Sequence, residues 1–265
     1  MFNLIDVSSE NRLVNDSQAS AYWNDEALEK NKSFNVVDLG FEKIEASPKY
    51  RALLDQISSV VDKARIDLDD KNILSVASGT CWIEAQWLNN SNFGSLSCID
   101  ISRHRIHKLA PFTLKHYGIL SADLMWGSVF DLPIDKKYDV VMLSQAFHHI
   151  EEPIRLLRFL REILSEAGII FIVGEHRYSN RKYHVQALKH FAKYALNYNG
   201  YRRLKSFYPS WQDCFPPDFE KGDIHWSESE YDFIFRKAGF SSYRHDVDKS
   251  GRFQSYTLSL RDTYA

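Results

Sequence analysis

The sequence predicts an α/β protein built on a doubly wound, largely parallel β-sheet. Its 265 residues carry 33 Lys and Arg against 35 Asp and Glu, with 44% hydrophobic residues, which is typical of a water-soluble globular chain. Short apolar segments without clean alternation, as in strands buried on both faces, alternate with segments of helical periodicity. Such alternation of strands and helices is typical of a parallel sheet with right-handed crossovers.

The first helix and strand of this pattern follow residue 46. Ser47 and Pro48 form a cap and a first-turn proline, and apolar residues then recur at helical spacing as far as Val61. The segment 72–77 is largely apolar and predicts a buried strand. Further strands are expected near residues 95–100, 122–126, 138–144 and 168–174, and helices near residues 82–89, 103–117 and 153–165.

The alternation stops after Gly174 and resumes near the C-terminus. A helix is expected over residues 228–238, closed by Gly239, and strands over residues 241–247 and 252–260. Because these two strands follow each other so closely, we expect them to pair antiparallel.

The chain shows no internal repeat, low-complexity tract or Gly/Ser linker. We therefore expect one core over residues 47–265, preceded by an N-terminal extension over residues 1–46. Residues 176–225 interrupt the core as an insert that is rich in basic and aromatic residues. Within it, residues 176–210 carry eight Lys or Arg and no Asp or Glu, which leaves the rest of the chain at a net charge of −10.

A helix of the insert is expected to pack on the core. Apolar residues recur there at helical spacing, and they are Val185, Leu188, Phe191, Ala195 and Tyr198.

The cysteines and the apolar stretches exclude several classes of protein. Cys81, Cys98 and Cys214 are too few and too widely spaced for a disulfide framework or a zinc site, so we expect buried thiols. No apolar stretch approaches the roughly 20 residues that cross a bilayer. The N-terminus lacks the basic start and apolar core of a secretory signal, and we expect a cytoplasmic protein.

Candidate binding residues follow the predicted strands, where doubly wound sheets bind their ligands. Gly79 permits a tight turn into the next helix, and Asp100 ends the second strand 21 residues later, a spacing typical of a carboxylate that binds a ribose diol. Asp131, beside Val129 and Phe130, is a candidate acceptor for an adenine amino group.

The next two strands end in groups suited to proton transfer. The strand 138–144 leads into a loop with His148 and His149, and Glu175 follows the strand after it. Histidine titrates near neutral pH and can act as a general base.

Taken in order, these segments resemble the class I S-adenosylmethionine (SAM)-dependent methyltransferases, especially the branch acting on small molecules and sugars. The resemblance covers about residues 50–260 and rests on the loop 74–81, Asp100, the segment 127–133 and the paired histidines. It implies a Rossmann-like sheet of seven strands, the last antiparallel, and SAM as cofactor. The cofactor contacts that it implies are Ser75, Ala77, Gly79, Asp100, Ile101, Phe130, Asp131 and Ser144.

The first loop departs from the pattern of that family, which usually has an acidic residue and three glycines. The corresponding residues here are Ser75, Ala77, Gly79 and Cys81. Alanine and cysteine are small enough to admit the methionine part of SAM, but Ser75 removes a carboxylate that usually organises the loop. A catalytically silent protein that serves as a binding or scaffold partner is therefore the alternative to an enzyme.

For the reaction we expect methyl transfer to a hydroxyl, with His148 or His149 as base and Glu175 holding the productive tautomer. The resemblance supports this pairing. The alternatives are that one histidine only binds the loop backbone and that Glu175 is a plain surface acid. Adjacent histidines on a loop are poorly specific for a metal, so we predict no metal site.

The insert supplies the expected acceptor site. Arg177, Arg181 and Arg202, with Tyr201 and His225, favour a small-molecule or glycan acceptor that bears phosphate or carboxylate groups. Aromatic faces also stack on bases, so RNA methylation remains a less favoured alternative. A solvated basic face and a structural His225 remain open as well.

In the N-terminal extension, Tyr22 and Trp23 are interpreted either as a lid on the cofactor or as packing anchors.

Overall fold

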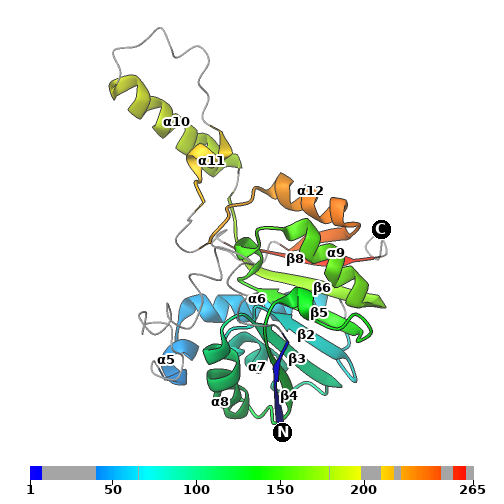
Figure 1. Ribbon diagram of the computed structural model, residues 1–265. Helices are drawn as coiled ribbons and strands as arrows, with labels where there is room; N and C mark the ends of the chain where they lie inside the picture. Colours follow the sequence, from blue (N-terminus) through cyan, green and yellow to red (C-terminus); the bar gives the residue numbers. More distant parts are fainter. Residues whose placement is uncertain are drawn as a thin grey trace.

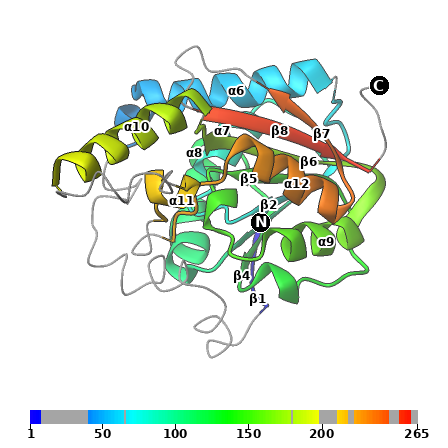
Figure 2. The same ribbon diagram turned by 90° about the horizontal axis from the view of Figure 1, so that it is seen from above.

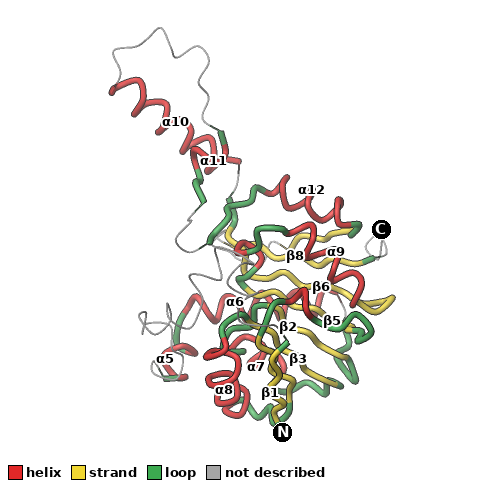
Figure 3. The backbone as a smooth tube through the Cα atoms, in the orientation of Figure 1, coloured by secondary structure: helices red, strands yellow, loops and turns green. Residues whose placement is uncertain are grey.

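The computed structural model describes residues 1–7, 40–64, 66–178, 180–197, 210–217, 222–245 and 253–260. The strands are β1 (Phe2–Asp6), β2 (Asn72–Val76), β3 (Ser95–Asp100), β4 (Ala122–Trp126), β5 (Tyr138–Ser144), β6 (Leu164–His176), β7 (Ser241–His245) and β8 (Phe253–Ser259). They form one sheet in the order β1-β4-β3-β2-β5-β6-β8-β7, with the helices outside it (Figure 1; Figure 3).

The helical elements connect these strands. The α-helices are α5 (Phe41–Glu45), α6 (Pro48–Ala64), α7 (Trp82–Leu88), α8 (Ala110–His116), α9 (Pro153–Ile163), α10 (Asn180–Asn197), α11 (Trp211–Cys214) and α12 (Glu228–Ala238). A π-helical segment, η2 (His104–Leu109), leads directly into α8, and two short 3₁₀ turns are η3 (Val129–Asp131) and η4 (Phe147–His149).

The predicted α/β class and the predominantly parallel sheet are confirmed. All neighbouring strands from β1 to β6 pair parallel, whereas β8 pairs antiparallel with both β6 and β7. The expected antiparallel last strand is therefore present, and it lies between two strands that run the other way.

The sheet has eight strands rather than the seven that the resemblance implied. The additional strand is β1, which pairs parallel with β4 and comes from the region expected as an N-terminal extension. All its residues but Phe2 are exposed, so the segment has no buried apolar pattern from which it could be identified in the sequence.

Helices lie on both faces of the sheet, as Figure 2 shows from above, and a hydrophobic core lies on each face. Strand β6 contributes to both of them, because its successive side chains point to opposite faces. Phe171 packs with Leu53 of α6 and Leu88 of α7, whereas Ile172 packs in the other core with Leu156 of α9 and Phe235 of α12.

The end signals predicted for the last helix are confirmed. Ser227 caps α12 in a capping box with Glu230, and Gly239 ends the helix with a φ of 86°. This helix supplies Tyr231 to the site described below.

The packing expected of the insert helix is wrong for the side chains that the structure describes. Val185 and Leu188 are 46% and 68% exposed, and the buried residue between them is Ala187. Figure 1 shows α10 extending away from the sheet, beside α11. The apolar spacing predicted the helix correctly, but it did not determine which surface the helix contacts.

The three cysteines are free and buried, as expected. Among the described residues, no helix is both long and apolar enough to cross a membrane.

Candidate active site

The site lies where four neighbouring strands of the sheet end together. Val76 of β2 pairs with Ile99 of β3 and with Leu143 of β5, and Ser144 of β5 pairs with Val173 of β6. Because these strands are parallel, the loops after them meet at one edge of the sheet. This is the edge at which doubly wound sheets bind ligands.

The loop after β2 is strained and tied to the next strand. Ala77, Gly79 and Cys81 have φ of 53°, 55° and 56°, in the left-handed region that favours glycine. The Gly79 N–H donates to Asp100 Oδ2 at 2.7 Å, and the Ser102 N–H donates to Asp100 Oδ1 at 2.8 Å. Each carboxylate oxygen has two lone pairs, so these bonds leave Asp100 the capacity to accept from a ribose diol as well.

A buried carboxylate beneath this loop was missed in the sequence. Glu84, in the first turn of α7, is 2% exposed, and its Oε1 accepts a hydrogen bond from Ser75 Oγ at 2.5 Å. Burial raises the pKa of Glu84 to about 7. In the sequence, an acid in a first helical turn is explained by the helix dipole alone, so nothing there indicates its burial.

The loops after β3 and β4 carry further residues that were expected to contact the cofactor, with Phe130 and Asp131 expected beside its adenine. Ile101 packs against the core below α6 and α7, and its carbonyl accepts from Trp126 Nε1 at 3.0 Å. Phe130 lies in η3, with the Arg155 guanidinium 4.3 Å from its ring centroid. Asp131 ends η3 and is partly buried.

Ser144, at the end of β5, provides a test of whether the edge suits a polar ligand. Its Oγ is buried and has no hydrogen-bond partner in the described part of the structure. A buried hydroxyl without a partner is costly, so a ligand group at this position fits the site.

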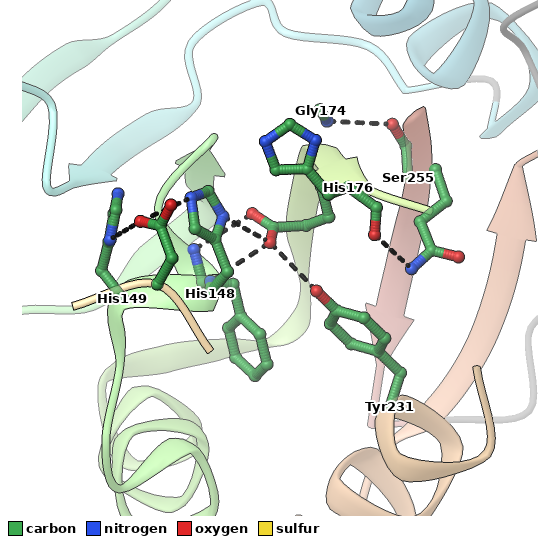
Figure 4. Close-up of polar contacts among 10 residues, drawn as sticks. His148, His149, Gly174, His176, Tyr231 and Ser255 are labelled. Atoms are coloured by element: carbon green, nitrogen blue, oxygen red, sulfur yellow. Dashed lines mark hydrogen bonds and ion pairs between the residues drawn. The ribbon is translucent and has the colours of Figure 1, made fainter. Parts of the chain in front are cut away.

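The first of the paired histidines, His148, is held by one fully buried acid, Glu175 of β6. Its Oε2 accepts from the His148 N–H at 3.1 Å, from Tyr231 Oη at 3.0 Å and from His148 Nδ1 at 2.9 Å, and its Oε1 accepts from the Phe147 N–H at 3.1 Å (Figure 4). Burial acts to raise the pKa of Glu175, but His148 and Tyr231 outweigh it and hold the pKa below its ordinary value. Glu175 is therefore ionised.

The ionised carboxylate fixes the tautomer of His148. Its Nδ1 carries the proton that is donated to Glu175, which leaves Nε2 as a proton acceptor. Burial and the neighbouring carboxylate raise the pKa of Tyr231, so its hydroxyl keeps its proton and donates as well. Tyr231 comes from the apolar face of α12, and its spacing in the sequence indicates only packing.

Asp223 is a further acid at this cluster that the sequence did not indicate. Its Oδ1 lies 3.1 Å from His149 Nδ1 and 3.9 Å from His148 Nε2, and the Ile224 N–H anchors the segment to the carbonyl of His148 at 2.8 Å. Burial acts to raise the pKa of Asp223, but the two histidines, with His225, hold it below its ordinary value. The acid therefore balances charge that develops on either imidazole.

Ligand atoms of His148, His149 and Asp223 all lie within 4.8 Å of one another, close enough to hold a metal ion. Asp223 Oδ1 lies 3.1 Å from His149 Nδ1, as an ion pair. We interpret the cluster as a proton-transfer group in which Asp223 pairs with the histidines.

Two of the five expected acceptor residues have described side chains. Arg177 Nε donates to Glu228 Oε1 at 3.1 Å, and Glu228 also pairs with Arg244 at 2.6 Å, so this arginine lies in an ion-pair cluster. The His225 ring lies 4.8 Å from Tyr178, and burial lowers the pKa of His225.

The other expected residues of the insert and extension are not described at the side-chain level. Arg181 lies in α10, but its side chain is outside the described part of the chain. Tyr201, Arg202, Tyr22 and Trp23 also lie outside the described residues.

Comparisons with known proteins agree with this geometry. A family model described as a methyltransferase domain matches residues 51–244. No curated protein sequence matches the chain significantly.

Among solved structures, the chain is similar to a SAM-dependent methyltransferase from Aquifex aeolicus, with a TM-score of 0.56, 15% identity, and coverage of 83% of this chain and 98% of that one. It is also similar to magnesium protoporphyrin IX methyltransferase from Synechocystis, solved with bound S-adenosylhomocysteine (SAH), at a TM-score of 0.54, 14% identity, and coverage of 90% and 95%. A protein assigned as an O-methyltransferase from Nostoc punctiforme gives a TM-score of 0.55 and 14% identity, and the match covers 77% of this chain but only 55% of that protein's length. These likenesses show the same fold, and the family match covers more than half of the chain. The chain therefore belongs to the class I SAM-dependent methyltransferases, and its cofactor is SAM.

Proposed function

We propose that the chain transfers the methyl group of SAM to a hydroxyl of a small-molecule or glycan acceptor. The observation that carries this proposal is the contact of 2.9 Å between His148 Nδ1 and the buried Glu175, which presents Nε2 as a proton acceptor. A hydroxyl must lose its proton during methylation, and a positioned base assists this step. The fold shared with a protein assigned as an O-methyltransferase also supports the proposal.

Bound SAM would supply a methyl group on a positively charged sulfur, and the acceptor oxygen would attack the methyl carbon in line with the sulfur, which is the leaving group. In the proposed step the oxygen–carbon bond forms, the sulfur–carbon bond breaks, and the acceptor proton moves to His148 Nε2. The products are SAH and a methyl ether. Glu175 stabilises the imidazolium through Nδ1, and Asp223, 3.9 Å from Nε2, adds a second negative charge beside it.

The acceptor that we propose bears a phosphate or carboxylate group. The composition of residues 176–210 supports this, because the segment contains eight Lys or Arg and no Asp or Glu. Arg177 is held by Glu228, so Arg181 and Arg202, with Tyr201, are the proposed contacts to the anionic group, and His225 is proposed to lie beside the acceptor.

A metal-independent mechanism predicts that chelation leaves turnover unchanged. Nucleotide sugars offer both hydroxyls and phosphates, so we expect the purified chain to transfer methyl from labelled SAM to such acceptors at the same rate with and without EDTA. Methyl ether formation is followed by mass spectrometry. Loss of turnover in EDTA that a divalent ion restores would show that His148, His149 and Asp223 hold a catalytic metal.

The proposed SAM contacts are those expected from the sequence, Ser75, Ala77, Gly79, Asp100, Ile101, Phe130, Asp131 and Ser144. The strongest support is the position of Asp100, 8% exposed and bonded to the Gly79 loop.

Replacing Asp100 by asparagine is expected to weaken SAM binding by about 10- to 100-fold, because hydrogen bonds to a charged acceptor are worth roughly 1.5–3 kcal/mol. Isothermal titration calorimetry measures the change, and Asp69→Asn in an exposed turn is the matched control. An unchanged Kd in a folded Asp100→Asn variant would refute the ribose role.

A further inference from the structure

Glu84 is an unusual residue for the interior of a protein. Its carboxylate is 2% exposed, and Ser75 Oγ is its hydrogen-bond donor among the described side chains. Burying a carboxylate costs several kcal/mol unless its environment compensates. The pKa of Glu84, raised by burial to about 7, shows that the compensation is incomplete.

The hydrogen bond from Ser75 to Glu84 joins the two ends of the loop that follows β2. Ser75 precedes the loop, and Glu84 follows it by one turn of α7, whose first residue comes directly after Cys81. Ala77 and Cys81 have left-handed backbone conformations that non-glycine residues adopt only when surrounding structure holds them. Asp100, at the end of β3, holds the loop through the Gly79 N–H, and Glu84 holds it through the Ser75 hydroxyl.

Glu84 is bonded to Ser75 and interacts electrostatically with Asp100, and both of these residues are among the proposed SAM contacts. SAM carries one more positive charge than SAH, because its sulfur bears the transferable methyl. A negative charge in a buried environment therefore stabilises bound SAM more than bound SAH.

We propose that Glu84 is a positioning residue of the cofactor loop and that its carboxylate makes the site prefer SAM over SAH. This inference rests on the cofactor of the family, and not on the proposed acceptor or the proposed base.

Among the described groups around Glu84 and its loop, Glu84 is the one whose charge changes near neutral pH. Asp100 is its acidic neighbour, and the negative charge of Asp100 contributes to raising the pKa of Glu84. Burial raises the pKa of the Cys81 thiol, and the pKa of the Cys98 thiol also lies above its ordinary value, so both remain neutral. Arg105, whose guanidinium is 3.6 Å from where a Cβ on Gly79 would lie, keeps its charge at every pH of interest.

The test measures the Kd of SAM and of SAH by calorimetry at pH 6 and pH 8, without an acceptor. In the wild-type chain, ionisation of Glu84 is expected to shift the ratio of the two affinities by about tenfold toward SAM as the pH rises. The amino-acid part is common to both ligands, so its titration cancels in the ratio. In Glu84→Gln the ratio is expected to be independent of pH, whereas Glu162→Gln, an exposed change on α9, keeps the wild-type dependence.

The variant Ser75→Ala separates the positioning role of Glu84 from the effect of its charge, because it removes the hydrogen bond and keeps the carboxylate. Losing the hydroxyl is expected to weaken SAM and SAH equally, by about 5- to 10-fold, while the ratio still depends on pH. Circular dichroism confirms that each variant is folded. A ratio in Glu84→Gln that still shifts with pH as in the wild type would overturn the charge role, and unchanged affinities in Ser75→Ala would overturn the positioning role. Either failure leaves the proposed acceptor and base untouched, since no methyl transfer is measured.

Discussion

Replacing His148 by alanine is expected to lower kcat for methyl transfer by about 10²- to 10⁴-fold, the usual contribution of a general base. The affinity for SAM is expected to stay near that of the wild type, because His148 contacts Glu175 and Asp223 and is not among the proposed cofactor contacts. Stopped assays of labelled methyl transfer give kcat, and calorimetry gives the Kd of SAM.

Two further variants identify the base. His116→Ala, a change on the surface of α8, is the matched control and is expected to keep full turnover. His149→Ala tests the neighbouring ring, which lies 3.1 Å from Asp223. Full turnover in His148→Ala together with its loss in His149→Ala would assign the base to His149 instead.

Replacing Glu84 by glutamine is expected to remove about 3 kcal/mol of the change in unfolding free energy between pH 5 and pH 8. The folded pKa of Glu84 is about 7, above the roughly 4.3 of a glutamate in the unfolded chain. Between these values the folded state keeps a proton that the unfolded state loses, so the free energy of unfolding falls as the pH rises from about 4.3 to 7 and is constant above. Each pKa unit corresponds to about 1.4 kcal/mol.

Urea unfolding at pH 5 and pH 8 measures this difference. The wild type is expected to lose stability between these values relative to Glu84→Gln, because glutamine cannot ionise. All other titrating groups are common to both chains and cancel in the comparison, and Glu162→Gln controls for removal of an acid. Parallel pH dependences for wild type and Glu84→Gln would show that Glu84 is not protonated in the fold.

Local patterns in the sequence were sufficient for most of the sheet and its helices. The strands 122–126 and 138–144 have the predicted bounds, as does the helix 228–238 with its cap at Ser227 and its end at Gly239. Each depends on an apolar run or on cap residues that are close together in the chain. The strand β1 could not be predicted, because it pairs with β4, about 120 residues away, and its exposed residues show no apolar pattern.

Some residues of the candidate site could be predicted from local sequence patterns, and others could not. Asp100 and Glu175 lie at the ends of strands and His148 lies in the loop after one, and these positions were predicted because parallel strands bring their ends to one edge of the sheet. Glu84 and Asp223 have no such signal. One is an acid in a first helical turn, and the other lies in the insert between β6 and α12.

The sequence by itself determined most of the strands and helices, the parallel sheet, and the edge of the sheet that carries Asp100 and the paired histidines, because periodicity and end signals act over a few neighbouring residues. Only the tertiary structure decided that Glu84 is buried against Ser75 and that Asp223 lies against the histidines. The protonation of a carboxylate depends on burial and on neighbours that are distant in the chain, and the fold alone brings these together.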